Sequence, residues 1–571
     1  MLRKQKHHIS INSRLTYLTL GIFVFAGVIA ARLFYLQVIK HGEYLELARN
    51  QQQYSTDLLP DRGNIYFRED KTGKLVTMAT TQKGYTLYID NRYLKDPESA
   101  YGALNTITPI DRTVFDAIVK KTNDPYEVLK QRVPLEEGDK IQALKVAGVG
   151  LQAKAWRLYP GDTMASQVLG FVSYTNDVPK GQYGAEKYFE SALQGSGGGT
   201  MSGEKDARGI ILALTDEINA SSQEGGDITL TIEPAIQQAA EDELKHLQEA
   251  WHPVRGGIAI VEPKTGKIKA MAAFPNFNPN EYSKEKDLSV FLNPFVEKIY
   301  EMGSVFKPLT MAAALDRGLV TPDTTYYDIG QIKINNRTIS NFDGKARGTR
   351  TMTQILEESL NTGAVFVMQK LGTEIFKQYF LNYGLTEKTG IDLPGEVAGN
   401  WNNIKTGREV EFATASFGQG IAVTPLELIM ALSSLGNGGE LLKPYIDESQ
   451  QRTVIRRVLT PETSRTITGM LVDVVDKALI GGKAKKEGYT IAAKTGTAQV
   501  IAANGKGYAT DQYLHSFFGY FPAYDPRFVV FLFIDRPQGV QYASHSLTDS
   551  FSALVDFLIN YYTIPPDRTA L

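Results

Sequence analysis

Pairs of serine and lysine three positions apart are the first feature of this sequence that can do chemistry. The pattern Ser-x-x-Lys begins at Ser202, Ser283 and Ser304. A lysine that has lost its proton beside a serine hydroxyl can act as a general base and turn that hydroxyl into a nucleophile. Ser202 and Ser283 lie among charged residues, which would keep the paired lysine hydrated and protonated, with a pKa of about 10.4.

The third copy has a different environment. Ser304 follows Gly303 and opens a largely apolar run, 305–315, whose helical pattern would partly bury Lys307. Residues three apart share a helix face, and desolvation lowers the pKa of a lysine, so a neutral amine would lie next to the hydroxyl. The helix N-terminus also offers N–H donors to an oxyanion. A serine N-cap beside a snorkelling lysine is the structural alternative for this motif alone.

Ser-x-Asn occurs twice, once at residue 10 before the first apolar segment and once at Ser359 and Asn361. The second copy follows Thr351 and Gln354, which have the spacing of a capping box at a helix start. We expect Ser359 to relay a proton to a leaving amine and Asn361 to hold Lys307 or a substrate amide. A serine and an asparagine that only satisfy a helix end are the alternative.

Lys-Thr-Gly is frequent in this chain and begins at Lys71, Lys264, Lys388, Lys405 and Lys494. The first four copies lie where turns are expected, whereas Lys494 lies in the β-prone stretch 489–500. Gly496 inside that strand indicates that another backbone comes close. We expect a substrate peptide to add as a strand there, with Lys494 and Thr497 binding its terminal carboxylate. Strict alternation puts these two side chains on opposite faces, so the prediction requires an irregular strand at Gly496.

The elements around these motifs predict one α+β domain. A short β run, a helix opened by Pro234, a hairpin, a long helical region and two late β stretches follow one another, at 228–232, 234–251, 257–273, 304–450, 489–500 and 516–535. Sheet segments at both ends with helices between them indicate that the terminal strands share one sheet.

The N-terminal region predicts a membrane anchor. The apolar stretch 15–39, interrupted by Arg32, is long enough to span a bilayer. Four basic residues and no acidic residue precede it, which keeps the N-terminus cytoplasmic and places the rest of the chain outside. A cleaved signal peptide, with Val28 and Ala30 at the small-residue positions, is the competing interpretation.

Four segments follow from these patterns. We expect a tail at 1–14, a transmembrane anchor at 15–39, a mixed α/β pedestal at 40–220 and a catalytic domain at 221–571. The boundary near 220 rests on the glycine-rich stretch 195–199 and the polar stretch 221–226, which are typical of linkers.

Composition excludes several kinds of protein. The chain has 571 residues, 43% of them hydrophobic, and a formal net charge of -2, which gives no electrostatic case for nucleic acid as a partner. It has no cysteine, which removes disulfides and thiol nucleophiles, and none of its seven histidines forms a His-Glu-x-x-His pattern. Neither a metal nor a cofactor is therefore expected.

The order Ser304, Ser359, Lys494 within one domain is the trio typical of penicillin-binding proteins and β-lactamases. On these motifs the chain resembles a class B penicillin-binding protein. Further stretches share the resemblance, at 61–65, 156–160, 181–186, 417–420 and 423–425. Met302 stands where the family usually has proline, and Ala185 where a larger aliphatic residue is usual.

The resemblance implies a fold and an activity. It implies a pedestal of the dimerisation type and a β-lactamase-like transpeptidase domain, with helices around an antiparallel sheet. It also implies a peptidoglycan D,D-transpeptidase that cross-links stem peptides through an acyl-enzyme and is inhibited by β-lactams. The implied catalytic and substrate-binding residues are Ser304, Lys307, Ser359, Asn361 and Lys494, then Thr495, Gly496 and Thr497. The backbone N–H groups of Ser304 and Thr497 are the implied oxyanion hole.

Two rival functions remain open, and the resemblance also implies partners. A carboxypeptidase or β-lactamase would use the same residues with water, and Glu396 and Asn400 lie in a loop superficially like that of a deacylating glutamate. A non-enzymatic β-lactam receptor is the second rival. The stretches 301–307, 389–396 and 417–420 look closer to the division type than to the elongation type. That implies septal wall synthesis beside a SEDS-family glycosyltransferase and division proteins in the bacterial cytoplasmic membrane.

Overall fold

The computed structural model describes residues 11–42, 44, 53–58, 61–121, 124, 126–175, 178–196, 199–205, 211–217, 223–405, 407–502 and 507–568. Most of the predicted cytoplasmic tail, including the Ser-x-Asn copy at residue 10, lies outside these ranges. Parts of both predicted linkers also lie outside them.

The N-terminal apolar stretch is helical, as predicted. Helix α1 (Ile11–Phe34) continues into the π-helical turn η1 (Tyr35–Ile39). Leu15–Ile39 has a mean hydropathy of 2.1 over its most apolar window, and none of that window is buried. A helix of this length with exposed apolar side chains on every side is suited to a lipid surrounding.

The chain divides into two compact units that do not follow chain order. The smaller unit combines 1–60, 85–152 and 195–224, and the larger unit combines 61–84, 153–194 and 225–571. The strands β3 (Leu75–Ile89) and β5 (Val149–Leu158) contribute to both. A sequence boundary placed near 220 from linker composition alone does not reveal this interleaving.

In the smaller unit, the helices α3, α4 and α5 pack their apolar faces against the strands β3 and β4. The core includes Leu87, Leu104, Phe115, Val133 and Ile141. A separate antiparallel sheet has the order β1-β8-β9. The elements are α3 (Pro97–Ile107), α4 (Arg112–Val119), β4 (Glu127–Pro134), α5 (Leu135–Ala143), β1 (Gln53–Leu58), β8 (Gly199–Lys205) and β9 (Ile211–Glu217).

The early segments of the larger unit join the strand that follows the second predicted linker. That strand, β10 (Ile228–Leu230), pairs in parallel with β2 (Ile65–Arg68), with Ile228 opposite Ile65. The neighbouring elements are α6 (Ser166–Leu169), β6 (Val172–Thr175), β7 (Val178–Gly181), α7 (Gly184–Tyr188) and α8 (Glu190–Leu193).

A buried ion cluster holds these early segments together. The Glu186 carboxylate accepts hydrogen bonds from Arg62 Nε at 2.7 Å and from Arg157 Nε at 2.6 Å, and Arg62 also reaches Glu190 at 2.7 Å. The side chains of Arg62, Arg157 and Glu186 are at most 3% exposed. Three stretches that carried the family resemblance, 61–65, 156–160 and 181–186, therefore meet at one structural site.

Glu186→Ala is expected to lower the free energy of unfolding of the larger unit by about 3–5 kcal/mol. Removing Glu186 leaves the buried Arg157 guanidinium without its carboxylate partner and Arg62 with Glu190 alone, and breaking a buried pair costs more than the intact pair contributes. Urea unfolding of the soluble region measures the change. Glu136→Ala is the matched control, because Glu136 pairs with Lys140 on an exposed helix surface. Equal midpoints for the two variants would contradict a structural role for the cluster.

The centre of the larger unit is a five-stranded antiparallel sheet in the order β12-β11-β21-β20-β19. Its strands are β11 (Arg255–Val261), β12 (Ile268–Phe274), β19 (Ala492–Ile501), β20 (Tyr508–Phe521) and β21 (Phe528–Asp535). The prediction that strands from both ends of the domain share one sheet is confirmed. The late stretch predicted at 516–535 contains two strands, because a turn at 522–527 divides it.

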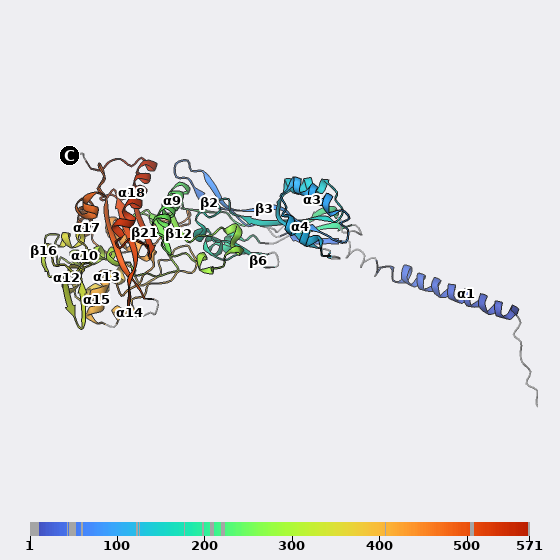
Figure 1. Cartoon of the computed structure of the whole chain (residues 1–571), viewed down its shortest axis with the longest axis horizontal. Helices are drawn as coiled ribbons and strands as arrows, with labels where there is room; N and C mark the ends of the chain where they lie inside the picture. The colour runs from blue at the N-terminus through green and yellow to red at the C-terminus, as the bar shows by residue number, and fades with distance from the viewer. Residues whose placement is uncertain are drawn as a thin grey trace, which may run out of the picture. The chain divides into compact units, whose positions relative to one another are not determined.

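Helices cover both faces of this sheet (Figure 1). Ile258 and Ile260 pack with α9 (Pro234–Trp251) and α18 (Ala543–Tyr562), whereas Ala259 and Val261 belong to the core of the opposite face. The alternation of the strand thus assigns each residue to a layer. The opposite face carries η4 (Gly303–Phe306), α10 (Lys307–Asp316), α11 (Met352–Glu357), α12 (Asn361–Leu371), α13 (Thr373–Asn382), α15 (Glu409–Ala415), α16 (Pro425–Gly436) and α17 (Pro461–Asp473).

A small β arm lies between α10 and α11. It consists of two antiparallel pairs, β13 with β16 and β14 with β15. Their bounds are β13 (Thr325–Asp328), β14 (Gln331–Ile334), β15 (Arg337–Ser340) and β16 (Gly348–Thr351). The remaining short elements are β17 (Glu440–Leu442), β18 (Val454–Arg457), α14 (Asn402–Lys405), η2 (Pro279–Lys284), η3 (Leu288–Phe291), η5 (Val474–Ala478) and η6 (Leu479–Gly482).

Candidate active site

Ser304 lies on the 3₁₀ turn η4, which leads directly into α10. Pro308 occupies the first turn of α10, where a missing N–H is tolerated. Lys307 is 1% exposed, and its Nζ donates to Ser304 Oγ at 2.9 Å. The structure therefore joins the predicted pair, although the serine sits on a 3₁₀ turn and not within an α-helix.

Glycines let the turn that carries Ser304 approach the edge strand β19 closely. A Cβ atom on Gly496 would lie 2.6 Å from Met302 O, and one on Gly303, whose φ is +64°, would lie 2.9 Å from Thr497 O. The close backbone approach predicted at Gly496 is confirmed. Ser516 Oγ, on β20, donates to Met302 O at 2.7 Å and so holds the turn against the sheet.

Ser359 is held in an unusual backbone conformation between α11 and α12. Its φ is +53°, a left-handed value that is uncommon for a residue with a side chain and often marks a functional position. Lys307 Nζ donates to Ser359 O at 2.5 Å and to Ser359 Oγ at 3.2 Å. The predicted capping box of Thr351 and Gln354 is present at the start of α11.

Lys494 approaches the same hydroxyl from the sheet. It is 2% exposed, and its Nζ donates to Ser359 Oγ and to Thr495 O, each at 3.0 Å. The lysines of the other four Lys-Thr-Gly copies are exposed, as are Ser283 and Lys286. One copy of each motif thus belongs to a hydrogen-bonded chain with two buried lysines, in the order Ser304, Lys307, Ser359 and Lys494. This distinguishes these copies from the exposed repeats of the same motifs.

Burial makes both amines easier to deprotonate. The pKa of Lys307 lies well below its ordinary value, mainly because burial disfavours the charged form and also because the positive charge of Lys494 is near. Burial alone lowers the pKa of Lys494 to about 7. A neutral Lys307 next to Ser304 Oγ has the arrangement of a general base and its nucleophile.

Asn361 is placed differently from the expectation that it holds Lys307. Its side-chain amide donates to Ser340 O at 2.9 Å and so ties the start of α12 to the β arm. The amide reaches this carbonyl because the arm folds back over the N-terminus of α12. The sequence pattern could not show that contact, since the two residues belong to different elements.

The prediction of an irregular strand at Gly496 is wrong. The ladder between β19 and β20 is continuous from Ala492 to Gln499, and the register shifts only after Gln499. Hydrogen bonds to β20 keep the ordinary alternation, so Lys494 faces Ser359 while Thr497 Oγ1 accepts from Ala543 N at 3.1 Å on the other side. β19 is nevertheless the last strand of its sheet, which leaves an edge suited to an added peptide strand.

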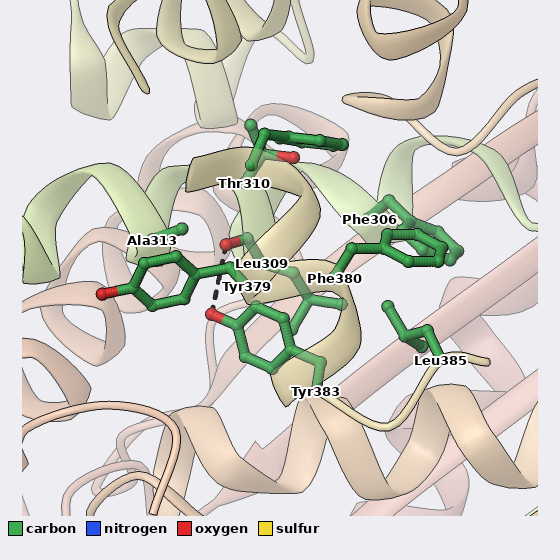
Figure 2. A pocket seen from close by; sticks show the side chains of 9 residues that line it. Phe306, Leu309, Thr310, Ala313, Tyr379, Phe380, Tyr383 and Leu385 are labelled. Carbon is green, nitrogen blue, oxygen red and sulfur yellow. Dashed lines mark hydrogen bonds between the residues drawn. The ribbon is translucent and has the colours of Figure 1, made fainter. Parts of the chain in front are cut away.

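An apolar recess lies behind α10 and not at the serine (Figure 2). Aromatic side chains of α13 and the residues after it line it together with Phe306 and Leu309, and Tyr383 Oη donates to Leu309 O at 3.2 Å. This recess contains none of the ionisable groups of the site. Within the described residues, no group of three or more His, Asp and Glu side chains is placed to hold a metal.

The sequence matches two family models that together cover most of the chain. Residues 256–556 match the penicillin-binding protein transpeptidase domain, and residues 57–230 match the penicillin-binding protein dimerisation domain. The chain belongs to the penicillin-binding proteins. It is a serine-type peptidoglycan transpeptidase, and its family accounts for the order of the three motifs.

Relatives within this family extend over nearly the whole chain. Stage V sporulation protein D of Bacillus subtilis is 32% identical over 93% of this chain and 83% of its own length. The peptidoglycan D,D-transpeptidase FtsI of Buchnera aphidicola is 27% identical over 99% of this chain and 98% of its own. Penicillin-binding protein 2X of Streptococcus thermophilus has the same fold, with a TM-score of 0.73 and 21% identity over 90% of this chain and 80% of that one.

Proposed function

We propose that this penicillin-binding protein cross-links peptidoglycan stem peptides through an acyl-enzyme on Ser304. The observation that carries the proposal is the hydrogen-bonded chain from Ser304 through Lys307 and Ser359 to Lys494. It lies in the domain that matches the transpeptidase family model.

The geometry supports acylation with Lys307 as the base. Its neutral Nζ takes the proton of Ser304 Oγ while that oxygen bonds to the carbonyl carbon of the penultimate D-alanine of a donor peptide. Backbone N–H groups of Ser304 and Thr497 would stabilise the oxyanion, a device that contributes about 2.7–4 kcal/mol per donor in known cases. The C–N bond then breaks, and the departing D-alanine amine receives a proton through Ser359 Oγ.

Deacylation uses the same groups in reverse. An amine of a neighbouring stem peptide attacks the ester carbonyl and gives its proton through Ser359 Oγ to neutral Lys307. The C–O bond then breaks, and Lys307 returns that proton to Ser304 Oγ. A new peptide bond replaces the one that was lost, so no external energy source is needed. We propose that Lys494, Thr495, Gly496 and Thr497 present the edge strand to the donor peptide, and that Asn361 faces its amide.

Two predictions follow at this site. The acidic limb of the acylation pH profile is expected to report protonation of Lys307, because only the neutral amine accepts a proton from Ser304. Lys494→Met should move that limb to higher pH, since it removes a positive charge that lowers the pKa of Lys307. Acylation rates with a fluorescent penicillin between pH 4 and pH 9 measure both. A limb that stays in place would contradict the electrostatic coupling.

Glu396→Gln is expected to leave the lifetime of the penicilloyl adduct unchanged. The Glu396 carboxylate accepts bonds from Thr389 N at 2.7 Å and from Gly390 N at 3.0 Å, so it closes a turn. A deacylating glutamate would instead have to activate water beside the ester. Recovery of free enzyme after penicillin washout measures the lifetime. A much longer lifetime in the variant would revive the β-lactamase interpretation.

We also propose a cellular place for the enzyme. The apolar helix at 15–39 anchors the chain by a single pass, and the basic residues before it favour a cytoplasmic N-terminus with the catalytic domain outside.

The division-like motifs and relatives named FtsI support septal synthesis. A SEDS-family glycosyltransferase would then supply the glycan. Depletion in a rod-shaped host should give filaments, whereas rounded cells that still divide would place the enzyme in elongation.

Mapping the site of penicillin attachment tests the chemistry. The soluble region is labelled with a fluorescent penicillin, digested, and the labelled peptide is sequenced by mass spectrometry. We expect the label on the peptide that contains Ser304. A label on the peptide that contains Ser283 would overturn the assignment.

A further inference from the structure

The edge strand β19 packs against the turn η4 that carries Ser304, and α12 packs against α10, which carries Lys307. We refer to these two elements as the β19 wall and the α12 wall, and each holds a loop. On the α12 wall, Thr362 N donates to Asn341 Oδ1 at 3.2 Å, next to the Asn361–Ser340 bond. This fixes the chain that leads into Phe342.

On the β19 wall, the loop before α18 is fixed in a similar way. Ala543 N donates to Thr497 Oγ1, and the buried ring of His515, on β20, contacts Gln541 O at 3.1 Å and Ser546 Oγ at 2.8 Å. Tyr542 therefore projects from a backbone that is anchored on both sides.

The two walls meet through an aromatic contact. The rings of Phe342 and Tyr542 lie edge to face, with centroids 5.6 Å apart and planes at 76°. Phe342 is 55% exposed, so burial in a core does not explain its position. The contact links the segment held by α12 with the segment held by β19.

Arg347 connects this contact to the segment that carries Ser359. Its guanidinium lies over the Phe342 ring, 5.6 Å from the centroid, and pairs with Asp343 at 2.7 Å and 2.9 Å. Its Nε also reaches Glu358 at 3.3 Å, and Glu358 directly precedes Ser359. The segment 340–347 is thus a stiff loop whose single apolar tip crosses to the opposite wall.

We propose that residues 340–347 form a strap that closes over the edge of β19 through the Phe342–Tyr542 contact. A donor peptide adding to the edge of β19 has to part the two rings, which makes Phe342 a specificity-determining residue that disfavours bulky donors. The proposal rests on the function proposed above, because it assumes that the acylated residue is Ser304.

If the strap restricts access, removal of the Phe342 ring should speed acylation. If the ring binds the donor, its removal should slow acylation. Phe342→Ala should raise the second-order rate constant for acylation by about 2- to 10-fold. This is the factor by which losing the free energy of one aromatic pair would increase the population of the open form. The rate constant should rise more for a thioester analogue of a D-Ala-ending stem peptide than for a small penicillin. Stopped-flow labelling of the soluble region measures both reactions.

Control variants isolate the ring contact. Tyr327→Ala removes another aromatic side chain of the same β arm, 72% exposed, and should leave both rates unchanged. Tyr542→Ala should raise the rates as Phe342→Ala does, and the double variant should show no further gain, because the contact is already lost. Thermal unfolding of each variant checks that the fold is retained.

Each outcome decides the proposal. Slower acylation in Phe342→Ala would show that the ring binds the donor. A rate equal to that of the wild-type protein would show that the rings do not restrict access. Either result would contradict the proposed strap. In both cases the label would still be on Ser304. A wild-type protein that carries no label on Ser304 would instead sink the proposed function itself.

Discussion

Ser304→Ala will abolish covalent labelling by a fluorescent penicillin while the protein remains folded. The Ser304 side chain is partly exposed and contacts Lys307 Nζ, so its loss removes the nucleophile without opening a core cavity. Gel fluorescence after a long incubation measures the label, and the urea midpoint checks the fold. Ser283→Ala is the matched control, since it removes an exposed serine with the same Ser-x-x-Lys spacing.

A label that persists in Ser304→Ala and disappears in Ser283→Ala would contradict this assignment. Loss of the label in both variants together with an early unfolding transition would point to a structural defect. The central expectation is therefore a large change in chemistry with a small change in stability.

Lys307→Met will slow acylation of Ser304 by about 10²–10⁴-fold, the usual contribution of a general base. Methionine keeps an unbranched side chain in a site that is 1% exposed, so packing is largely retained. Rapid-quench kinetics with penicillin measures the rate. Adding Ser304→Ala should abolish the residual acylation of Lys307→Met, because no nucleophile then remains.

Lys286→Met is the control for this prediction, because Lys286 is the exposed partner in the Ser283 copy of the motif. It should acylate at the wild-type rate. A Lys307→Met variant that also acylates at the wild-type rate would assign the base to another group, with Lys494 the first candidate because it contacts Ser359 Oγ.

Local patterns predicted many elements of the catalytic domain, but the prediction of a helical region at 304–450 is wrong where the strands β13 to β17 lie, because strands this short give too little pattern to tell them from helix. Pro234 marks the start of α9, and the hairpin of β11 and β12 follows from two apolar runs around a Pro-Lys-Thr-Gly turn. These features depend on residues that are neighbours in sequence, where turn chemistry and helix capping act directly. The repeated motifs were also separable, because the apolar context of Lys307 indicated its burial and the β-prone context of Lys494 indicated its place in a strand.

Contacts between distant segments were not accessible in the same way. The convergence of Lys307 and Lys494 on Ser359 joins three elements, and the cluster around Glu186 joins stretches more than a hundred residues apart. The error at Gly496 has the same origin, since pairing with β20 fixes the alternation of β19 and a single strand does not reveal its neighbour.

The most direct test of the account follows the bond that the enzyme makes. The soluble region is mixed with a thioester analogue of a D-Ala-ending stem peptide, with and without an acceptor amine from a second stem peptide, and both protein and products are weighed by mass spectrometry. We expect an acyl group on the peptide that contains Ser304, and an amide product that joins donor and acceptor. Release of the free acid alone, with the acceptor present and unused, would make this chain a hydrolase and contradict the account.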